Sequence, residues 1–261
     1  MAAFEPAVSM APRLRAMDEP QGDCWPELVD ALRDAILASP HDETAHADIV
    51  RKTACICSDP TRLAENLLAG TARLLGEMWL EDDVDFVAVT LATHLLTNLL
   101  MRLEEAPETF GFAAGPRAAG IERGTVALMV APGEQHGFGL CLLAYRLRYV
   151  GWQVHVAEGE RDLVEHAFDR RPLAIGISAG HAEAIDRIAS VVRLLRQRCS
   201  PRVLNIAVGG PAFSTPDCSR AVVACDLVAT TADDMLTWLD KLGVETPSSP
   251  RLCTGDRLRP V

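Results

Sequence analysis

The sequence predicts an N-terminal four-helix bundle followed by a flavodoxin-like α/β domain of the Rossmann type, with a five-stranded parallel sheet. Two observations indicate this order. Residues 25–102 contain four stretches with helical apolar spacing, joined by short connections that are typical of antiparallel neighbours. Beyond residue 124, short apolar runs alternate with helical patterns, which favours parallel strands covered on both faces.

These patterns divide the chain into five expected parts. Residues 1–23 lack periodicity and are expected to form a flexible arm, and residues 24–104 form the bundle. Residues 105–123 are rich in Gly, Ala and Pro and predict a linker. Residues 124–243 form the α/β domain, and residues 244–261 a flexible tail.

Local signals place the helices of the bundle. The predicted helices cover residues 25–39, 44–56, 60–79 and 84–102. Ser39-Pro40 ends the first helix, because a residue before proline avoids the helical region. Asp59-Pro60 opens the third with an N-cap and a proline at the first helical position. The acids Glu81-Asp82-Asp83 precede the fourth, where they suit a helix N-terminus and could also contact a partner.

The α/β half follows a strand–helix alternation. The predicted strands cover residues 126–130, 154–157, 173–178, 203–208 and 227–230. The predicted helices cover residues 138–149, 162–170, 182–198, 217–225 and 232–242. Ligands of such folds lie beyond the carboxyl ends of the strands, so the loops at 131–139, 178–180 and 209–211 are the candidate site.

Composition limits the class of partner and the compartment. The net charge of −11 argues against direct nucleic-acid binding and favours a basic protein partner. No basic-then-apolar leader and no uninterrupted apolar span of about 18 residues is present, so we expect a soluble cytoplasmic protein without membrane contact. The 8 cysteines are scattered and are interpreted as ordinary thiols, with redox sensing as the alternative.

The loop after the first strand carries the strongest chemical signal. His136 follows Glu134 by two residues and precedes Gly139 by three. An imidazole there can bind a metal through one nitrogen while a carboxylate orients the other. Gly137 and Gly139 leave room for a large planar ligand near the backbone. The alternative is an ordinary loop histidine that binds no metal.

This E-x-H-x-x-G pattern resembles the D-x-H-x-x-G cobalamin-binding motif, with Glu134 in place of Asp. Further matching phrases are Gly76-Glu77-Met78-Trp79, Gly151-Trp152 and Gly209-Gly210-Pro211-Ala212-Phe213. Residues 25–242 thus resemble the helix-capped cobalamin-binding modules of light-sensing bacterial regulators and corrinoid methyl carriers. Because no helix-turn-helix segment is present, the chain is most similar to the AerR/PpaA group of stand-alone cobalamin-binding antirepressors of photosynthesis genes.

The resemblance implies roles for residues on the α/β side. His136 becomes the lower axial cobalt ligand, and Glu134 the group that orients it. Gln135 and Phe138 belong to the same cofactor loop. The slot for the nucleotide tail falls to Ser178-Ala179-Gly180, where the family has S-x-L, and to Gly209-Gly210-Pro211.

On the bundle side, photosensitive relatives carry W-x9-E-H, in which the tryptophan covers the upper axial group. Here Trp79 is present, but Val89 and Thr90 stand at the Glu and His positions. One helical turn after Thr90, His94 is a possible upper ligand, with an ordinary bundle histidine as the alternative. His181 is a second candidate, with a surface position as its alternative.

The resemblance therefore implies a cobalamin-dependent, light-responsive antirepressor that binds a transcriptional repressor and is not an enzyme. Adenosyl-, methyl- and hydroxo- or aquocobalamin all stay open as the bound form. The alternatives are a corrinoid protein carrying methyl groups for a methyltransferase system, and a haem-binding redox sensor that uses His136 as its axial ligand.

Overall fold

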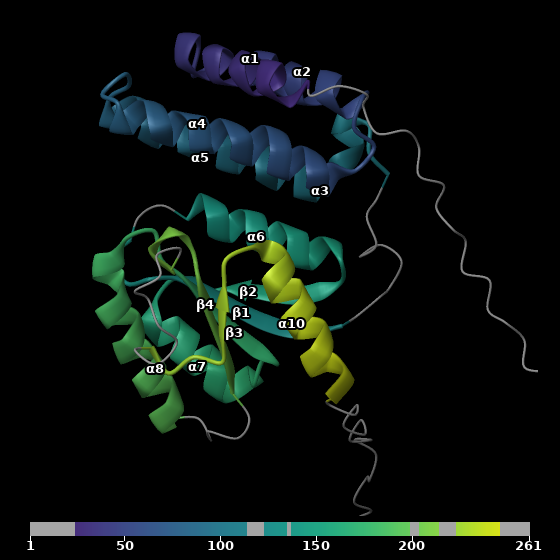
Figure 1. The fold of residues 1–261 in the computed structure, drawn as a ribbon. Helices are drawn as coiled ribbons and strands as arrows, with labels where there is room; N and C mark the ends of the chain where they lie inside the picture. Colours follow the sequence, from purple (N-terminus) through teal and green to yellow (C-terminus); the bar gives the residue numbers. More distant parts are fainter. Residues whose placement is uncertain (1–23, 114–122, 135–136, 199–203, 214–222, 246–261) are drawn as a thin grey trace, which may run out of the picture.

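The computed structural model describes residues 24–113, 123–134, 137–198, 204–213 and 223–245 (Figure 1). The expected arm, most of the expected tail and most of the helix expected over 217–225 lie outside these residues. Gln135 and His136 lie outside them as well.

A layer of helices from the N-terminal half lies over the α/β half (Figure 1). Its elements are α1 (Trp25–Ala38), α2 (Glu43–Ala54), α3 (Pro60–Leu63), α4 (Ala69–Leu80) and α5 (Phe86–Glu105). Aspartate side chains cap three of the helix starts, since Asp42, Asp59 and Asp85 accept hydrogen bonds from backbone N–H groups of the first turns. Asp59 with Pro60 thus opens a helix as predicted.

Between α3 and α4 the chain stays helical but changes its winding. Ala64–Leu68 forms a π-helical segment. Together α3, this segment and α4 run as one helix from Pro60 to Leu80, which the sequence predicts apart from the π winding. Side chains after a π turn are rotated about the helix axis relative to a regular α-helix, and such turns are frequent at functional sites.

The second half is a parallel sheet of five strands in the order β2-β1-β3-β4-β5, which confirms the predicted fold class. Its strands are β1 (Gly124–Val130), β2 (Trp152–Val156), β3 (Ala174–Ser178), β4 (Asn205–Gly209) and β5 (Leu227–Ala229). The helices are α6 (Phe138–Tyr149), α7 (Glu160–Arg170), α8 (Ile185–Arg198) and α10 (Ala232–Glu245).

Alternation along the strands divides the core of the sheet in two. Ala127 and Met129 face the cluster that contains α7 and α8, whereas Val126 and Leu128 face the cluster that contains α6 and α10. Both faces are therefore covered, as near-continuous apolar strands require.

Helix α6 is buried on two sides. Leu140, Ala144 and Leu147 pack on the sheet, while Phe138 and Tyr145 belong to the apolar core of the bundle. Burial raises the pKa of the Tyr145 phenol and keeps it neutral. The bundle and the α/β half are thus joined through a shared helix, with Figure 1 showing α6 between them.

The beginning of the segment expected as a linker packs against the bundle. Pro107–Phe110 forms a 3-10 helix, and Phe110 and Phe112 are buried in the bundle core. The guanidinium carbon of Arg102 lies 5.8 Å from the centre of the Phe110 ring. The residues between 113 and 123 lie outside the described part of the chain.

By length and apolar composition, α5 alone among the described helices could cross a membrane. A core helix of a bundle meets the same criterion. Here the buried residues of α5 form the core of the bundle with α1 and α4; they are Ala92, Leu95, Leu96, Leu99, Leu100 and Leu103.

Candidate cofactor-binding site

The carboxyl ends of three strands lie side by side at one edge of the sheet. The register pairs Val130 of β1 with Ser178 of β3, and Ser178 with Gly209 of β4. Hydrogen bonds continue beyond the strands, from the Ala131 N–H to the Ser178 carbonyl and from the Ala179 N–H to the Gly209 carbonyl. The loops predicted to form the site are therefore neighbours in space.

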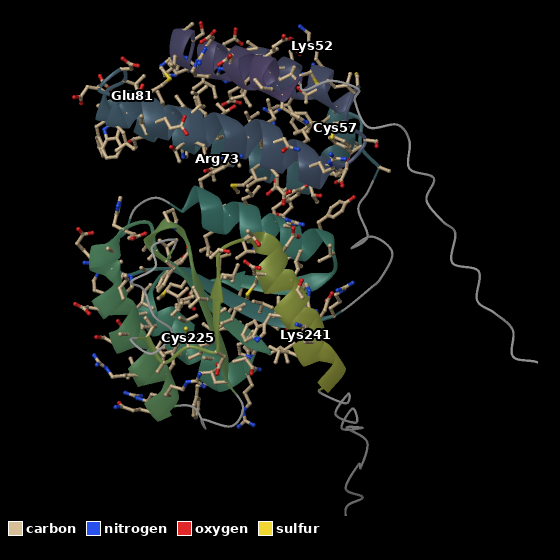
Figure 2. All side chains as sticks on the ribbon, viewed as in Figure 1. Lys52, Cys57, Arg73, Glu81, Cys225 and Lys241 are labelled. Atoms are coloured by element: carbon tan, nitrogen blue, oxygen red, sulfur yellow. The ribbon has the colours of Figure 1, made fainter. Side chains whose placement is uncertain are left out.

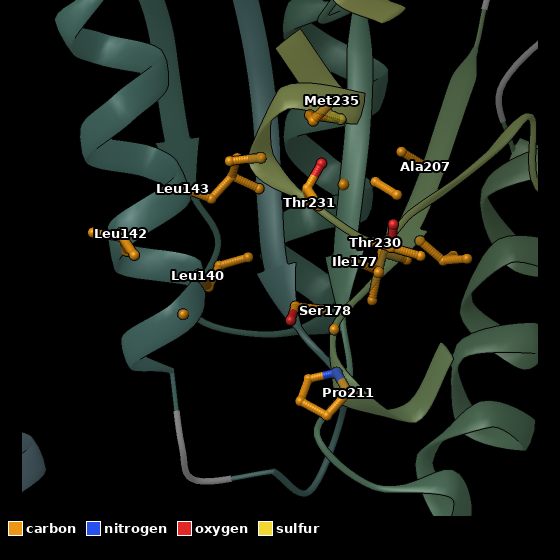
Figure 3. Close-up of a pocket in the computed structure, with 17 residues that line it drawn as sticks. Leu140, Leu142, Leu143, Ile177, Ser178, Ala207, Pro211, Thr230, Thr231 and Met235 are labelled. Carbon is orange, nitrogen blue, oxygen red and sulfur yellow. The ribbon is translucent and has the colours of Figure 1, made fainter. Parts of the chain in front are cut away.

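A cavity of about 240 Å³ opens at this edge, between α6, the ends of β3 and β4, and the start of α10 (Figure 3). Its walls are mainly apolar, with Leu140 and Leu143 on one side and Met235 on another. The polar side chains in its lining are the hydroxyls of Ser178, Thr230 and Thr231. A largely apolar cavity with a few polar groups is typical of a small-molecule site.

The glycines that line the cavity differ in the space around them. A Cβ at Gly209 would lie 2.6 Å from the Ala229 carbonyl oxygen. Gly210 has φ +96°, and its Cβ would lie 2.4 Å from the Ala179 carbonyl oxygen. Protein packing alone thus requires glycine at both positions. At Gly139 a Cβ would meet no atom within 4 Å, so that glycine leaves open space at the cavity.

The three hydroxyls that line the cavity differ in whether they already form hydrogen bonds with the protein. Asp234 accepts hydrogen bonds from the Thr230 hydroxyl and from the Thr230 and Thr231 N–H groups, which holds its pKa below the usual range. The Asp234 N–H in turn donates to the Thr231 hydroxyl, which completes a capping box at the start of α10. No group in the described part of the chain pairs with the Ser178 hydroxyl, which can therefore serve a ligand.

Glu134 fastens two loops together. Its carboxylate accepts hydrogen bonds from the Gly180 N–H at 2.7 and 2.9 Å and from the His181 N–H at 3.0 Å. The acid of the E-x-H-x-x-G segment thereby anchors the loop after β3 to the loop after β1. Its proposed second task, orienting His136, stays a prediction because His136 is not among the described residues.

The predicted residues next to Glu134 take separate positions. Gly137 precedes α6, and Phe138 is buried in the bundle core rather than facing the cavity. Gly139, Ser178 and the glycine pair all line the cavity. Pro211 joins them in the lining, whereas Ala179 is fully buried behind it.

The predicted bundle residues lie on exposed surface. The Trp79 side chain is 41% exposed near the end of α4. Thr90 and His94 are exposed on α5, and the Thr90 hydroxyl donates to the Phe86 carbonyl oxygen at 2.7 Å. The turn between α4 and α5, marked by Glu81 in Figure 2, lies at the same end of the molecule as the start of α6.

Sequence reasoning missed two features of the α/β half. Thr231 and Met235 line the cavity although neither was singled out. Both could have been predicted to line the site, because they follow the fifth strand, whose carboxyl end lies at the edge where ligands bind in such folds. The second feature is a stack of His155 on His166, with ring centroids 3.9 Å apart.

This stack is tied to the start of α7. The His155 Nε2 atom lies 3.2 Å from both oxygens of Asp162, and the Glu158 N–H donates to the same carboxylate. Burial lowers the pKa of His166. Across the described ranges, no three His, Cys, Asp or Glu side chains are grouped to hold a metal ion. A metal ion that takes only one histidine ligand from the protein needs no such group.

Comparison with known proteins decides the family. The chain is 31% identical over 170 residues to the "uncharacterized 20.5 kDa protein in bchF-crtJ intergenic region" of Rhodobacter capsulatus, covering 64% of this chain and 84% of the relative. This chain belongs to the family of that protein. No protein-family model matches the sequence.

A solved structure shares the fold of this chain. The monomethylamine corrinoid protein of Methanosarcina barkeri superposes with a TM-score of 0.65 at 18% identity, over 83% of this chain and 99% of that one. A cobalamin-binding protein of Desulfitobacterium hafniense matches at a TM-score of 0.41 and 17% identity, over 82% of this chain and 98% of that one. The first comparison shows that this chain has the fold of that protein, with helices preceding a Rossmann-like domain.

We expect Glu134→Gln to loosen the loop after β3. An amide keeps one acceptor oxygen but turns an NH₂ group toward backbone donors, so the free energy of unfolding should fall by about 1.5–3 kcal/mol. Urea denaturation measures this change. Glu183→Gln, at an exposed position close by, is the matched control and should leave the midpoint unchanged; equal midpoints for both variants would contradict the anchoring role.

Proposed function

We propose that this protein binds cobalamin and regulates photosynthesis or tetrapyrrole genes as an antirepressor of the AerR/PpaA type. The observation that carries the proposal is the apolar cavity at the carboxyl edge of the sheet, beside the E-x-H-x-x-G segment. The fold of a corrinoid protein supports the cofactor. The relative described as lying between bchF and crtJ, in a photosynthesis gene region, supports the regulatory role.

The cavity suits the nucleotide tail of cobalamin. A benzimidazole base is flat and apolar, and the cavity offers Leu140, Leu143 and Met235 as apolar walls. The Ser178 hydroxyl, which pairs with no group among the described residues, would meet a polar atom of the tail. Open space at Gly139 admits the chain that joins the tail to the ring.

The remaining roles follow the motif. His136 would ligate the cobalt of cobalamin through an imidazole nitrogen, and Glu134 would orient that imidazole while anchoring the loop after β3. Trp79 would cover the cofactor from the bundle side, and the His94 imidazole would be available there as a second nitrogen ligand. Both side chains are exposed and so accessible to a ligand. When bound, the cofactor would supply a light-sensitive cobalt–carbon bond in its alkyl forms.

The helices connect such a site to a protein surface. Phe138 and Tyr145 bind α6, which starts beside the site, to the core of the bundle. A different ligand state would favour a different packing of the bundle, as for any ligand with unequal affinity for two conformations. The protein would thus act in the cytoplasm by presenting a surface to a repressor, without turning over a substrate.

The end of the bundle offers that surface. Leu80, Phe86 and Val87 are 78%, 54% and 70% exposed around the turn between α4 and α5. The acids of this turn, Glu81, Asp82, Asp83 and Asp85, are exposed beside them. Exposed apolar side chains bordered by carboxylates match a repressor segment that carries both apolar and basic residues.

The two alternative functions, methyl transfer and haem binding, differ in their support. Methyl transfer by a corrinoid protein uses the same fold, and the cofactor experiment below tests it. The haem alternative receives no support from the comparisons, and we do not propose it.

We expect the purified protein mixed with cobalamin to retain a red colour through desalting, and His136→Ala to lose it, because the alanine cannot ligate cobalt. Absorption spectra in the dark and after illumination measure this. His94→Ala should retain cobalamin but change the spectrum after illumination. A His136→Ala variant that holds cobalamin as firmly as the parent would contradict the ligand assignment, and methyl transfer from the methylcobalamin-loaded protein to a thiol acceptor would favour the methyl-carrier alternative.

Gly139→Leu should block the cavity without harming the fold, because its Cβ meets no protein atom within 4 Å. We expect cobalamin affinity to fall about tenfold or more, since added volume in a filled site costs about 1–3 kcal/mol. Cobinamide, which has the corrin ring but no nucleotide tail, should lose less affinity than cobalamin does. Gly159→Leu, also in open space but away from the cavity, is the control; unchanged cobalamin affinity in Gly139→Leu would show that the tail lies elsewhere.

The double variant Phe86→Ser, Val87→Ser should weaken repressor binding about tenfold, as loss of apolar anchors at an interface does. The measurement is retention of a purified repressor of photosynthesis genes on the immobilised, cobalamin-loaded protein. Phe168→Ser removes an equally exposed phenylalanine from α7 and should change nothing. Equal retention by loaded and cofactor-free protein would contradict the switch.

A further inference from the structure

One arginine joins three parts of the molecule. Arg146 lies on α6 with its side chain 21% exposed, and its guanidinium pairs with Glu65 of the bundle and with Asp233 of α10. The partners are 81 and 87 residues away in sequence. A guanidinium presents donors on two edges of a rigid plane, so it can bind two carboxylates at once.

The bundle partner lies in the irregular part of its helix. Glu65 belongs to the π-helical segment Ala64–Leu68, and its carboxylate contacts Arg146 of α6. Arg73, labelled in Figure 2, donates to the Ala69 carbonyl oxygen at 3.2 Å and to the Glu65 carbonyl oxygen at 3.5 Å. Carbonyl groups around the π turn thus have a side-chain donor.

The other partner lies beside the cavity. Asp233 is in the first turn of α10, between the cavity residues Ala232 and Met235. On α6, Leu142 and Leu143 line the opposite wall, one helical turn before Arg146. Arg146 therefore spans two walls of the cavity and also holds the bundle.

Further contacts join α6 to the bundle without a residue of α10. Arg148 pairs with Glu104 of α5 at 3.1 Å. Phe138 and Tyr145 pack into the bundle core. The two ion pairs of Arg146 thus connect α10 and the bundle through one side chain.

We propose that Arg146 is a positioning residue that couples occupancy of the cavity to the placement of the helical bundle. This inference rests on the proposed function, because the cavity occupant is the nucleotide tail of cobalamin. A tail between α6 and α10 sets the spacing of those helices. Arg146 transmits that spacing to Glu65, so the bundle responds to the tail and not only to the corrin ring.

The experiment compares cobalamin with cobinamide on the full-length protein. Hydrogen exchange of the α4 and α5 amides is measured without ligand and with each corrinoid, and both dissociation constants are measured by absorption. In the parent, cobalamin should protect α4 and α5 more than cobinamide does. Asp233→Ala should abolish this tail-dependent difference and weaken cobalamin binding about threefold, the scale of an exposed ion pair, with cobinamide binding unchanged.

Asp240→Ala is the matched control. Asp240 is an exposed acid on the same helix, and it pairs at 2.5 Å with Arg123, which directly precedes β1, rather than with Arg146. This variant should keep the parent's tail-dependent protection. Full retention of that protection in Asp233→Ala would overturn the proposal, and so would its equal loss in both variants.

A second measurement separates this inference from the proposed function. Absence of binding of either corrinoid by the parent would refute cobalamin binding. In that case the urea midpoints of Glu65→Gln, Asp233→Ala and the double variant in the cofactor-free protein decide the link. Non-additive changes support a connection through Arg146, whereas additive changes overturn it.

Discussion

The structure depends on a helix that must be buried on two sides. Helix α6 packs on the sheet through Leu140 and Leu147 and enters the bundle core through Phe138 and Tyr145. Without the bundle, these two aromatic side chains would face water at the start of the α/β domain. The same helix supplies one wall of the cavity. The bundle, the sheet and the site therefore share helix α6, and a shift of this helix would change the packing of all three.

Much of the fold could be predicted because it follows from periodicity and strand-end rules. Apolar runs flanked by helical patterns predicted the parallel sheet, and the register that pairs Ser178 with Gly209 brought two predicted loops together. The π winding at Ala64–Leu68 could not be predicted, because no residue type marks it. Nor could the pairing of Arg146 with Glu65 and Asp233, since many acids were available and only the tertiary fold selects among them.

Glu134 shows where a motif and its packing differ. The sequence indicates an acid that orients His136, whereas the structure shows three hydrogen bonds from the amides of Gly180 and His181. A carboxylate has about four acceptor sites, so these bonds leave room for one more donor. Glu is one methylene longer than the Asp of the resembling motif, and its carboxylate contacts the loop after β3. One residue can thus anchor a neighbouring loop and still meet an imidazole.

A ligand shifts a conformational equilibrium only by its unequal affinity for the two states. Buried apolar contacts, such as those of Phe138, hold the bundle on α6. The energy of these contacts differs little between two conformations as long as the side chains stay buried in both. Ion pairs near the surface can exchange partners with water at small cost. Arg146 and Arg148 form ion pairs of this kind from α6. Arg146 also pairs with Asp233 of α10, the helix that lines another wall of the cavity. The apolar core therefore sets the resting geometry, and the charged links decide how readily occupancy of the cavity can alter it.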